Sequence, residues 1–337
     1  MQRITKLIFA LPALMLISTA LYSQELKIIS QGTHTSLRGL CPVSDQIIWA
    51  SGSSGFVGVS VDGGINWRWQ QVKGYEKTEF RDIEAFNENT ALIMGITEPA
   101  VILRTEDAGQ TWNLVYSDTS KGCFFDAIDF SDTQNGILIG DPLDGRAYLA
   151  STTNGGKSWH HLPPQDRPFL DSGEACFASS GSNIIKMNKK GYEFITGGLT
   201  SHFYDGRSRK KLPLLQGRET TGANAMAKNN KNYRVVVGGD FMKMDDTTGV
   251  CTFSVNGGKT WQQPEETCHG YRSSVEWIGK NSWVACGLNG VDISNDAAKH
   301  FTKISPVGYN VCKISPHGKR VFFAGSNGRI AVMNSKN

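Results

Sequence analysis

The stretch SVDGGINW at residues 60–67 recurs along this chain of 337 residues. Further copies are TEDAGQTW at 105–112, TTNGGKSW at 152–159 and SVNGGKTW at 254–261, and a degenerate copy, SNDAAKHF, occupies 294–301. The shared pattern is a hydroxyl residue, an Asp or Asn at the third position, usually a Gly at the fifth, and an aromatic residue at the eighth. Recurrence of one octapeptide indicates that the chain is assembled from copies of one structural unit.

Each conserved type in the octapeptide has a physical role. The Asp or Asn can accept hydrogen bonds from backbone N–H groups of its own turn. The Gly allows a positive φ, as a tight hairpin requires, and the closing aromatic residue buries a large apolar area where the next strand begins. We therefore interpret the octapeptides as structural hairpins. Their key residues are Asp62, Trp67, Asp107, Trp112, Asn154, Trp159, Asn256, Trp261 and Asp296.

A second repeating signal counts the units. Seven short apolar runs each end in Gly, at positions 52, 95, 140, 198, 239, 287 and 325. A period of about 45 residues built from short strands is typical of four-stranded propeller blades. The sequence therefore predicts an all-β, seven-bladed β-propeller. We expect LKIIS at 26–30 to supply the missing strand of the last blade, beside residues 330–333, which would close the ring and remove an exposed edge.

The N-terminal segment has the layout of a secretory signal peptide. Arg3 and Lys6 precede an apolar run at 7–21, and Ser23 with the polar residues after it favours cleavage near Gln24. The alternative is a retained membrane anchor, because the uncharged run is long enough. We predict a signal peptide at 1–23 and one propeller domain at 24–337. The mature protein is then periplasmic or secreted, with no stable membrane insertion.

Charge and cysteine content narrow the possible partners and cofactors. Removal of residues 1–23 lowers the formal net charge from +4 to +2, which gives no reason to expect binding to nucleic acid or to anionic membranes. The seven cysteines form no metal-binding pattern, so we expect neither a metal nor another cofactor. Cys251 and Cys268 flank one hairpin and are the one pair considered for a disulfide. Buried free thiols are expected at Cys41, Cys176, Cys286 and Cys312.

The octapeptides also assign the two faces of the disk. They join the third strand of a blade to the fourth, so they share one face, the back face. The opposite front face receives the starts of the innermost strands, which include Arg38, Arg81 and Arg272. We predict that these arginines, with Tyr271 and Glu276, form a binding site for a protein partner. In the alternative, the arginines join blades by pairing with carboxylates, for which the candidates are Asp82, Glu84, Asp126 and Glu276.

The octapeptide resembles the Asp-box, also called the BNR repeat. FRDI at 80–83, the apolar run ending in Gly and the following box together resemble the photosystem II stability/assembly factor family. That resemblance implies an exported, non-catalytic, monomeric propeller whose arginine-bearing face binds an envelope or membrane-protein assembly intermediate. Arg38, Arg81 and Arg272 match the family's pattern, whereas units three, four, five and seven lack the arginine.

Two enzyme classes are the alternatives. A sialidase-like or other glycoside hydrolase would share the boxes and need two carboxylates across a cleft, or a Tyr–Glu pair such as Tyr271 and Glu276. The candidate carboxylates on the front face are Asp82, Asp126, Asp141, Glu174 and Asp240. An oxidoreductase has weaker support, because the glycines at 52, 55 and 58 do not have the G-x-G-x-x-G spacing of a dinucleotide site.

Overall fold

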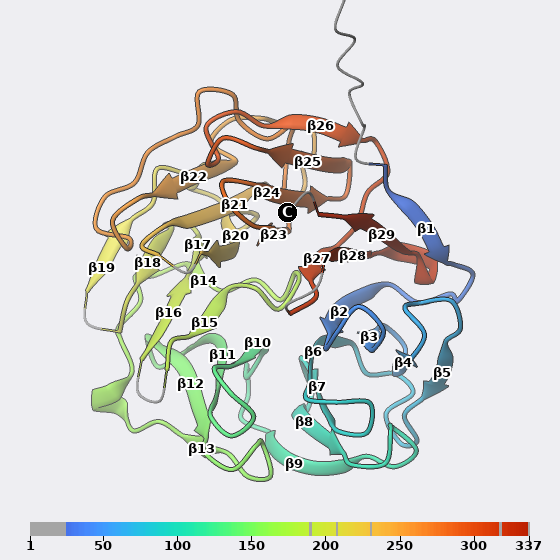
Figure 1. The fold of residues 1–337 in the computed structure, drawn as a ribbon. Helices are drawn as coiled ribbons and strands as arrows, with labels where there is room; N and C mark the ends of the chain where they lie inside the picture. Colours follow the sequence, from blue (N-terminus) through green and yellow to red (C-terminus); the bar gives the residue numbers. More distant parts are fainter. Residues whose placement is uncertain (1–24, 189–190, 207, 230, 317–318, 336–337) are drawn as a thin grey trace, which may run out of the picture.

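A computed structural model describes residues 25–188, 191–206, 208–229, 231–316 and 319–335. Seven sheets stand around a central channel, which confirms the predicted all-β, seven-bladed propeller (Figure 1). The described part of the chain contains only two short 3₁₀ helices, η1 (Pro164–Asp166) and η2 (Ser326–Gly328), and none of its helices is both long and apolar enough to cross a membrane. The predicted signal peptide lies outside the described residues.

The first three blades have four strands each. Blade one holds β2 (Leu37–Pro42), β3 (Ile48–Gly52), β4 (Phe56–Ser60) and β5 (Arg68–Gln71). Blade two holds β6 (Phe80–Ala85), β7 (Ala91–Gly95), β8 (Ala100–Thr105) and β9 (Asn113–Asp118). Blade three holds β10 (Phe125–Phe130), β11 (Gly136–Leu143), β12 (Arg146–Thr152) and β13 (His160–His161).

The remaining blades complete the ring. Blade four holds β15 (Ile184–Lys186), β16 (Tyr192–Ile195), β18 (His202–Tyr204) and β19 (Arg209–Lys211). Blade five holds β20 (Thr221–Lys228), β21 (Arg234–Asp240) and β22 (Cys251–Ser254), extended by β17 (Gly197–Gly198) and β14 (Glu174–Ala175). Blade six holds β23 (Ser274–Trp277), β24 (Trp283–Gly287), β25 (Gly290–Ser294) and β26 (Thr302–Ser305). Blade seven holds β27 (Val311–Ile314), β28 (Arg320–Ala324), β29 (Ile330–Asn334) and β1 (Lys27–Ser30).

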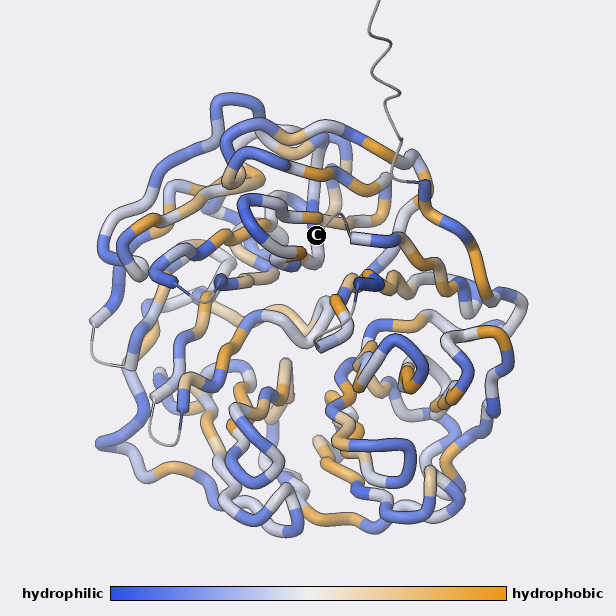
Figure 2. Tube along the Cα trace, in the orientation of Figure 1, coloured by the Kyte–Doolittle hydropathy of each residue, from blue (hydrophilic) through white to orange (hydrophobic). Residues whose placement is uncertain are grey.

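The N-terminal strand closes the ring. β1 pairs antiparallel with β29, with Lys27 opposite Val332 and Ile28 opposite Ala331. The last blade therefore combines strands from both ends of the chain. Each of the seven apolar clusters of the core lies between two neighbouring blades. Figure 2 shows the hydrophobic residues along the strands and hydrophilic residues in many of the connecting turns. Burial between blades is thus the main stabilising interaction of the ring.

Blade four does not begin at residues 172–175, which take the place in the fourth repeat that FRDI at 80–83 takes in the second. Its innermost strand is β15, and Glu174–Ala175 instead pair with Gly197–Gly198 at the edge of the blade-five sheet. The intervening segment, residues 176–183, enters the channel mouth. Small and polar residues suit that position because they hydrogen-bond to several blades, as described below.

The disulfide considered between Cys251 and Cys268 is not formed in this structure. Cys251 and Cys268 are both free and buried, in the apolar cluster between blades five and six. The other five cysteines are free as well. Cys251 and Cys268 thus pack as small apolar side chains.

The octapeptides form one hydrogen-bonded turn repeated five times. In the first copy, Asp62 accepts from Ser60 Oγ and from the backbone N of Asn66, both at 2.9 Å, and the backbone N of Gly64 donates to Ser60 Oγ. The degenerate copy keeps this pattern, with Asp296 accepting from Ser294 Oγ at 2.8 Å and from the backbone N of His300 at 3.1 Å. The Asp side chain of the motif therefore bonds within its own turn, whereas the turn's backbone also reaches another loop, as when Gly63 N donates to the carbonyl of Gln46 at 2.9 Å.

The second glycine of a box has a packing role as well. Gly258 has a φ of +83°, and a Cβ there would lie 2.3 Å from the ring of Phe203 in the neighbouring blade. The box turn therefore presses against the preceding blade. In the degenerate copy Ala298 takes this position with φ 61° and is fully buried, so the turn tolerates a methyl group there.

Replacing Asn256 by Ala is expected to lower the free energy of unfolding by about 1–2 kcal/mol. The Asn256 side chain accepts from the backbone N of Thr260 at 3.0 Å and donates to Thr260 Oγ1 at 2.8 Å, and both bonds would be lost. Urea denaturation measures the change. Asn256→Asp is the control, because it keeps the acceptor and is the residue of other copies. An equal loss in both variants would contradict this role.

Candidate functional site

A pocket of about 330 Å³ opens at the channel mouth on the front face. Its wall includes Arg38 and Arg81 from the starts of innermost strands, Asp141 from the last part of the second strand β11, and Phe241 and Leu288 from loops that follow second strands. Innermost strands begin and second strands end at this face, whereas the boxes follow the far ends of third strands. The pocket therefore lies opposite the boxes.

Residues 176–183, here named the plug segment, form the floor of this pocket. Ser180 Oγ donates to the carbonyl of Ser273 in the connection to blade six at 2.7 Å, and Ser179 Oγ donates to Asn224 Oδ1 of blade five at 2.7 Å. Arg38 Nη1 of blade one donates to the carbonyl of Ser179 at 3.4 Å. The plug segment thus spans the channel mouth, where Figure 1 shows the loop before β15 reaching the centre of the ring.

Arg38 and Arg81 both line the front pocket, as the sequence predicted. Both side chains are half-buried. Burial, followed by the positive charge of Arg38, lowers the pKa of Arg81. The nearest counter-charge of Arg81 is Glu79, whose Oε2 lies 3.9 Å from Arg81 Nε, and that Nε makes no hydrogen bond. Two close, weakly compensated guanidinium groups favour an anionic group of a ligand.

Arg272 does not belong to this pair, so the predicted three-arginine arc is wrong. Its side chain is 0% exposed, and its Nη2 lies 2.5 Å from Oδ2 of Asp292 in the neighbouring strand β25. Arg272 Nη1 also donates to Asn289 Oδ1 at 2.6 Å. The physical reason is that Asp292 Oδ2, Asn289 Oδ1 and the carbonyl of Tyr271 accept hydrogen bonds from Nε and Nη1 of this guanidinium. The alternative of a structural ion pair holds for Arg272, although its partner is not one of the predicted carboxylates.

The predicted partners Tyr271 and Glu276 are separated as well. Tyr271 lines the pocket, and its hydroxyl donates to Asn224 Oδ1 at 2.9 Å. Glu276 lies deeper in the channel, where burial raises its pKa to about 7 and the charge of Lys313 opposes that rise. The Tyr–Glu nucleophile pair of the sialidase alternative is therefore not assembled.

Glu276 belongs to a group of charged residues inside the channel, here named the channel cluster: Asp82, Glu84, Asp129, Glu276 and Lys313. Burial is the first cause that raises the pKa of each carboxyl group, to about 6 for Asp82 and Asp129. Burial lowers the pKa of Lys313, but attraction to the four carboxylates, with Glu276 first, outweighs it and raises the pKa overall. One ammonium thus offsets several carboxylates inside the channel.

The five candidate catalytic carboxylates do not line one common pocket, although Asp126 and Asp141 are close enough for their charges to interact. Asp141 is the one among them that lines the front pocket, and burial raises its pKa to about 6. Asp126 is fully buried; burial first, then the Asp141 charge, raises its pKa, while Arg81 lowers it. Asp82 accepts from the backbone N of Ile128 in the channel. Asp240 is buried and accepts from the backbone N of its own turn. The geometry expected of a glycosidase, two carboxylates facing across a cleft, is not formed by this set.

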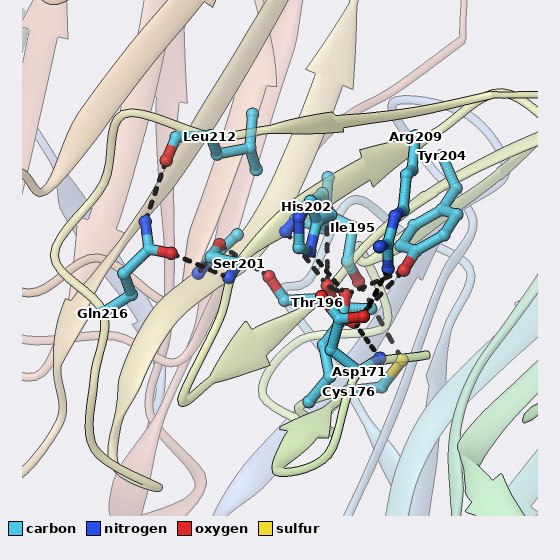
Figure 3. A network of polar contacts seen from close by, with 12 residues as sticks. Asp171, Cys176, Ile195, Thr196, Ser201, His202, Tyr204, Arg209, Leu212 and Gln216 are labelled. Atoms are coloured by element: carbon cyan, nitrogen blue, oxygen red, sulfur yellow. Dashed lines mark hydrogen bonds and ion pairs between the residues drawn. The ribbon is translucent and has the colours of Figure 1, made fainter. Parts of the chain in front are cut away.

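Glu174 is part of a hydrogen-bond network inside blade four. His202 Nδ1 lies 3.0 Å from its Oε1, the Tyr204 hydroxyl donates to the same oxygen at 3.0 Å, and Thr196 donates as well. Burial would raise the pKa of Glu174, but these hydrogen bonds, with that of His202 first, lower it. Figure 3 shows His202, Thr196 and Tyr204 converging, with Arg209 beside them. Glu174 therefore acts as a structural acceptor.

One group of potential metal ligands occurs among the described residues, formed by Asp171, Glu174 and His202, whose ligand atoms lie within 4.8 Å of one another. The Glu174 oxygens already accept hydrogen bonds from side chains, and Asp171 Oδ1 pairs with Arg209 Nη1 at 2.6 Å. The group's oxygens are thus committed to protein donors. The glycines considered for a dinucleotide site lie on the β3–β4 hairpin, and a strand follows them.

Sequence reasoning missed the apolar part of the front pocket. Phe177 of the plug segment packs edge-on against Phe241, with ring centroids 5.8 Å apart, and Phe241 packs against Tyr271. Met242, which follows Phe241 in the chain, is 73% exposed. Leu288, which lines the pocket, is exposed as well. The only signal was the unusual FMKM at 241–244, which places three apolar residues in a polar loop. Exposed apolar side chains around a pocket are typical of interaction sites.

The fold and pocket define the class: a seven-bladed propeller with a basic and apolar front pocket. A family model described as the Rax2 C-terminal beta propeller domain matches residues 201–317. No curated protein matches the chain. A structure of YCF48 bound to D1 peptide matches with a TM-score of 0.64 and 16% identity, covering 93% of this chain and 97% of that one.

Two further structures show the same architecture. YCF48 from Cyanidioschyzon merolae matches with a TM-score of 0.64 and 18% identity, covering 92% of this chain and 98% of that one. The Neurospora crassa Pan2 WD40 domain matches with a TM-score of 0.62 and 10% identity, over 94% of this chain and 97% of that one. The resemblance to the YCF48 propellers is thus confirmed in architecture. Because one fold serves many functions, the pocket gives better evidence of function than the fold does.

Proposed function

We propose that this protein is a binding protein that holds a segment of a partner protein in the front pocket. An acidic side chain or a terminal carboxylate of the partner meets Arg38 and Arg81, and neighbouring apolar side chains pack on Phe177, Phe241 and Leu288. The observation that carries the proposal is the pair of half-buried, weakly compensated arginines beside an apolar wall. A volume of about 330 Å³ suits one or two side chains.

The propeller provides a rigid frame for this mode of binding. Arg38 and Arg81 stand at equivalent register shifts near the starts of adjacent innermost strands, β2 and β6, and the residues on either side of each arginine are paired within the same blade. The plug segment holds the floor through hydrogen bonds to blades on opposite sides of the channel. Little ordering of the pocket is therefore needed on binding, which favours affinity. The peptide-bound YCF48 propeller supports a peptide as ligand here.

The predicted signal peptide is consistent with a partner outside the cytoplasm. We propose that residues 1–23 direct export and that the partner is an envelope or membrane-protein assembly intermediate, bound by a monomeric propeller without catalysis. Comparison of the N-terminus of the mature protein with the encoded sequence tests the first part. A mature chain that begins near Gln24 supports export, and a chain in the envelope that retains residues 1–23 contradicts cleavage.

The double variant Arg38→Ala/Arg81→Ala is expected to weaken peptide binding at least about tenfold. Peptides are first selected from a random displayed library on the wild-type protein, and their affinities are then measured by fluorescence anisotropy. We expect the selected peptides to combine an acidic group with an adjacent large apolar residue. The arginines supply the charge-assisted hydrogen bonds that the variant lacks.

Arg68→Ala is the charge-matched control, since Arg68 is exposed on the outer strand β5. It is expected to bind the selected peptides as the wild type does. Leu288→Ala tests the apolar wall and is expected to weaken binding without changing its salt dependence. Equal affinities of the wild type and the double variant, or selection of basic peptides, would overturn the proposal.

A further inference from the structure

A second pocket, of about 600 Å³, lies away from the front pocket at the outer edges of blades three and four. One wall is the connection that follows β13, including Arg167 and Phe169, and the other comes from blade four, including Tyr192 and Tyr204. In Figure 1 this connection runs along the rim between β13 and β19. We name it the rim pocket. None of its residues belongs to the front pocket.

The rim pocket contains a buried cation that has no ion-pair partner among the residues that the structure describes. Arg167 is 8% exposed, and within the described parts of the chain its guanidinium forms no ion pair. Its Nη1 donates one long hydrogen bond of 3.5 Å to the carbonyl of Ala147, and its Nε makes none. Most of its five donors are therefore unused. Burial of a charged group is costly unless the group is paired, so this arrangement points to an anionic group that binds here.

Another arginine of the rim pocket is already paired. Arg209 Nη1 lies 2.6 Å from Asp171 Oδ1, and this contact raises the pKa of Arg209. Figure 3 shows Arg209 beside Tyr204 at this edge of blade four. Arg209 is therefore committed to protein acceptors, whereas Arg167 is available to a ligand. A carboxylate is the planar anion that the guanidinium fork of Arg167 binds best in two parallel hydrogen bonds.

The rest of the lining indicates what carries the carboxylate. Phe169 is 64% exposed, and the guanidinium carbon of Arg146 lies 3.5 Å from its ring centroid, which fixes the ring as a platform. Asp166 and Gln165 also line the pocket and offer acceptors for hydroxyl groups. A ligand that is only anionic would be repelled by Asp166, whereas a sugar acid brings hydroxyl donors for Asp166 together with a carboxylate for Arg167.

We infer that the rim pocket binds an acidic saccharide, with the uronate carboxylate on Arg167 and a sugar ring on Phe169. The volume is large enough for a disaccharide. This inference concerns a site separate from that of the proposed peptide binding and does not depend on it.

Titration calorimetry and saturation-transfer NMR with the full chain test the inference. The ligands are digalacturonate and a glucuronate-containing disaccharide, with galactobiose as the neutral match and citrate as a carboxylate without sugar. We expect a Kd of about 1 mM or tighter for at least one acidic disaccharide, and binding of galactobiose weaker by about tenfold or more. Arg167→Met should weaken binding of the acidic disaccharide at least about tenfold, and Phe169→Ala should weaken it several-fold.

Arg38→Ala is the control that separates the two sites, because it changes only the front pocket and should leave saccharide binding unchanged. Circular dichroism verifies that each variant is folded, and Phe169→Ala provides the test if Arg167→Met does not fold. Absence of binding by both acidic disaccharides at about 10 mM would overturn the inference. Equal affinity for galactobiose, or tighter binding of citrate, would overturn it as well.

Discussion

Replacing Arg272 by Ala is expected to lower the free energy of unfolding by about 3–5 kcal/mol. Arg272 and Asp292 are both 0% exposed, and Arg272 Nε donates to Asp292 Oδ2 at 2.7 Å. Removal of the guanidinium leaves the Asp292 carboxylate buried with only its contacts to His269. An uncompensated charge in the interior of blade six is the reason for so large a loss.

Urea denaturation of the wild type, Arg272→Ala and Arg38→Ala measures this effect. Arg38 is half-buried at the front pocket, so its replacement should change stability by less than about 1 kcal/mol. The double variant Arg272→Met/Asp292→Asn should recover part of the loss, because no buried charge remains and Asn can still accept from His269. Equal small losses for Arg272→Ala and Arg38→Ala would contradict the structural role of Arg272.

Replacing Lys313 by Met is expected to destabilise the protein in a pH-dependent way, by about 3 kcal/mol at pH 8 and much less at pH 5. The charge of Lys313 lies among Asp82, Glu84, Asp129 and Glu276 in the channel. At pH 8, above their pKa values of about 6 to 7, Asp82, Asp129 and Glu276 are ionised and need the ammonium. At pH 5 the groups with pKa values of about 6 to 7 are protonated in the folded state, so the ammonium has less to compensate.

The same groups determine whether the stability of the wild type rises or falls with pH. Burial raises the folded-state pKa of Asp82 and Asp129 to about 6 and of Glu276 to about 7, above unfolded values near 4. The folded protein therefore binds more protons than the unfolded chain between about pH 4 and pH 7, and these groups make stability fall as the pH rises through that window. The raised pKa of Lys313 adds stability that is present below its unfolded pKa, and thus throughout this range.

Denaturation curves at pH 5, 6, 7 and 8 test the channel cluster, with Lys210→Met as the matched control. Lys210 is exposed on β19, so its replacement should shift all four curves by the same small amount. A loss for Lys313→Met that does not increase from pH 5 to pH 8 would show that Lys313 does not compensate these carboxylates.

The box turns were predictable because the hydrogen bonds of their Asp or Asn side chains lie within eight residues. Asp62 and Asn256 find their donors four residues ahead, so the local sequence suffices to specify the turn. The number of blades could be predicted for a related reason, since a Gly lies at or within a few residues of the end of each second strand. Blade four was misplaced because its innermost strand, Ile184–Lys186, is short and follows a segment with no strand pattern.

The candidate site was predicted only in part. Arg38, Arg81 and Arg272 follow similar residues at equivalent strand starts, yet two line the front pocket and one is buried. The difference is Asp292, which reaches Arg272 from a strand twenty positions along the chain. Glu276 likewise joins the channel cluster through carboxylates of other blades. A strand-start pattern places an arginine at the channel mouth, but it does not identify the acceptors that other strands bring near.

By itself, the sequence determined the propeller, its seven units and the face that carries the boxes. These features depend on turns and strand periods, in which the interacting groups are close in the chain. Only the tertiary structure decided that residues 176–183 fill the channel mouth, that Phe241 and Leu288 join two arginines in one pocket, and that Arg167 is buried without an ion-pair partner in the described part of the chain. Those outcomes depend on groups from different blades, whose proximity is set by closure of the ring.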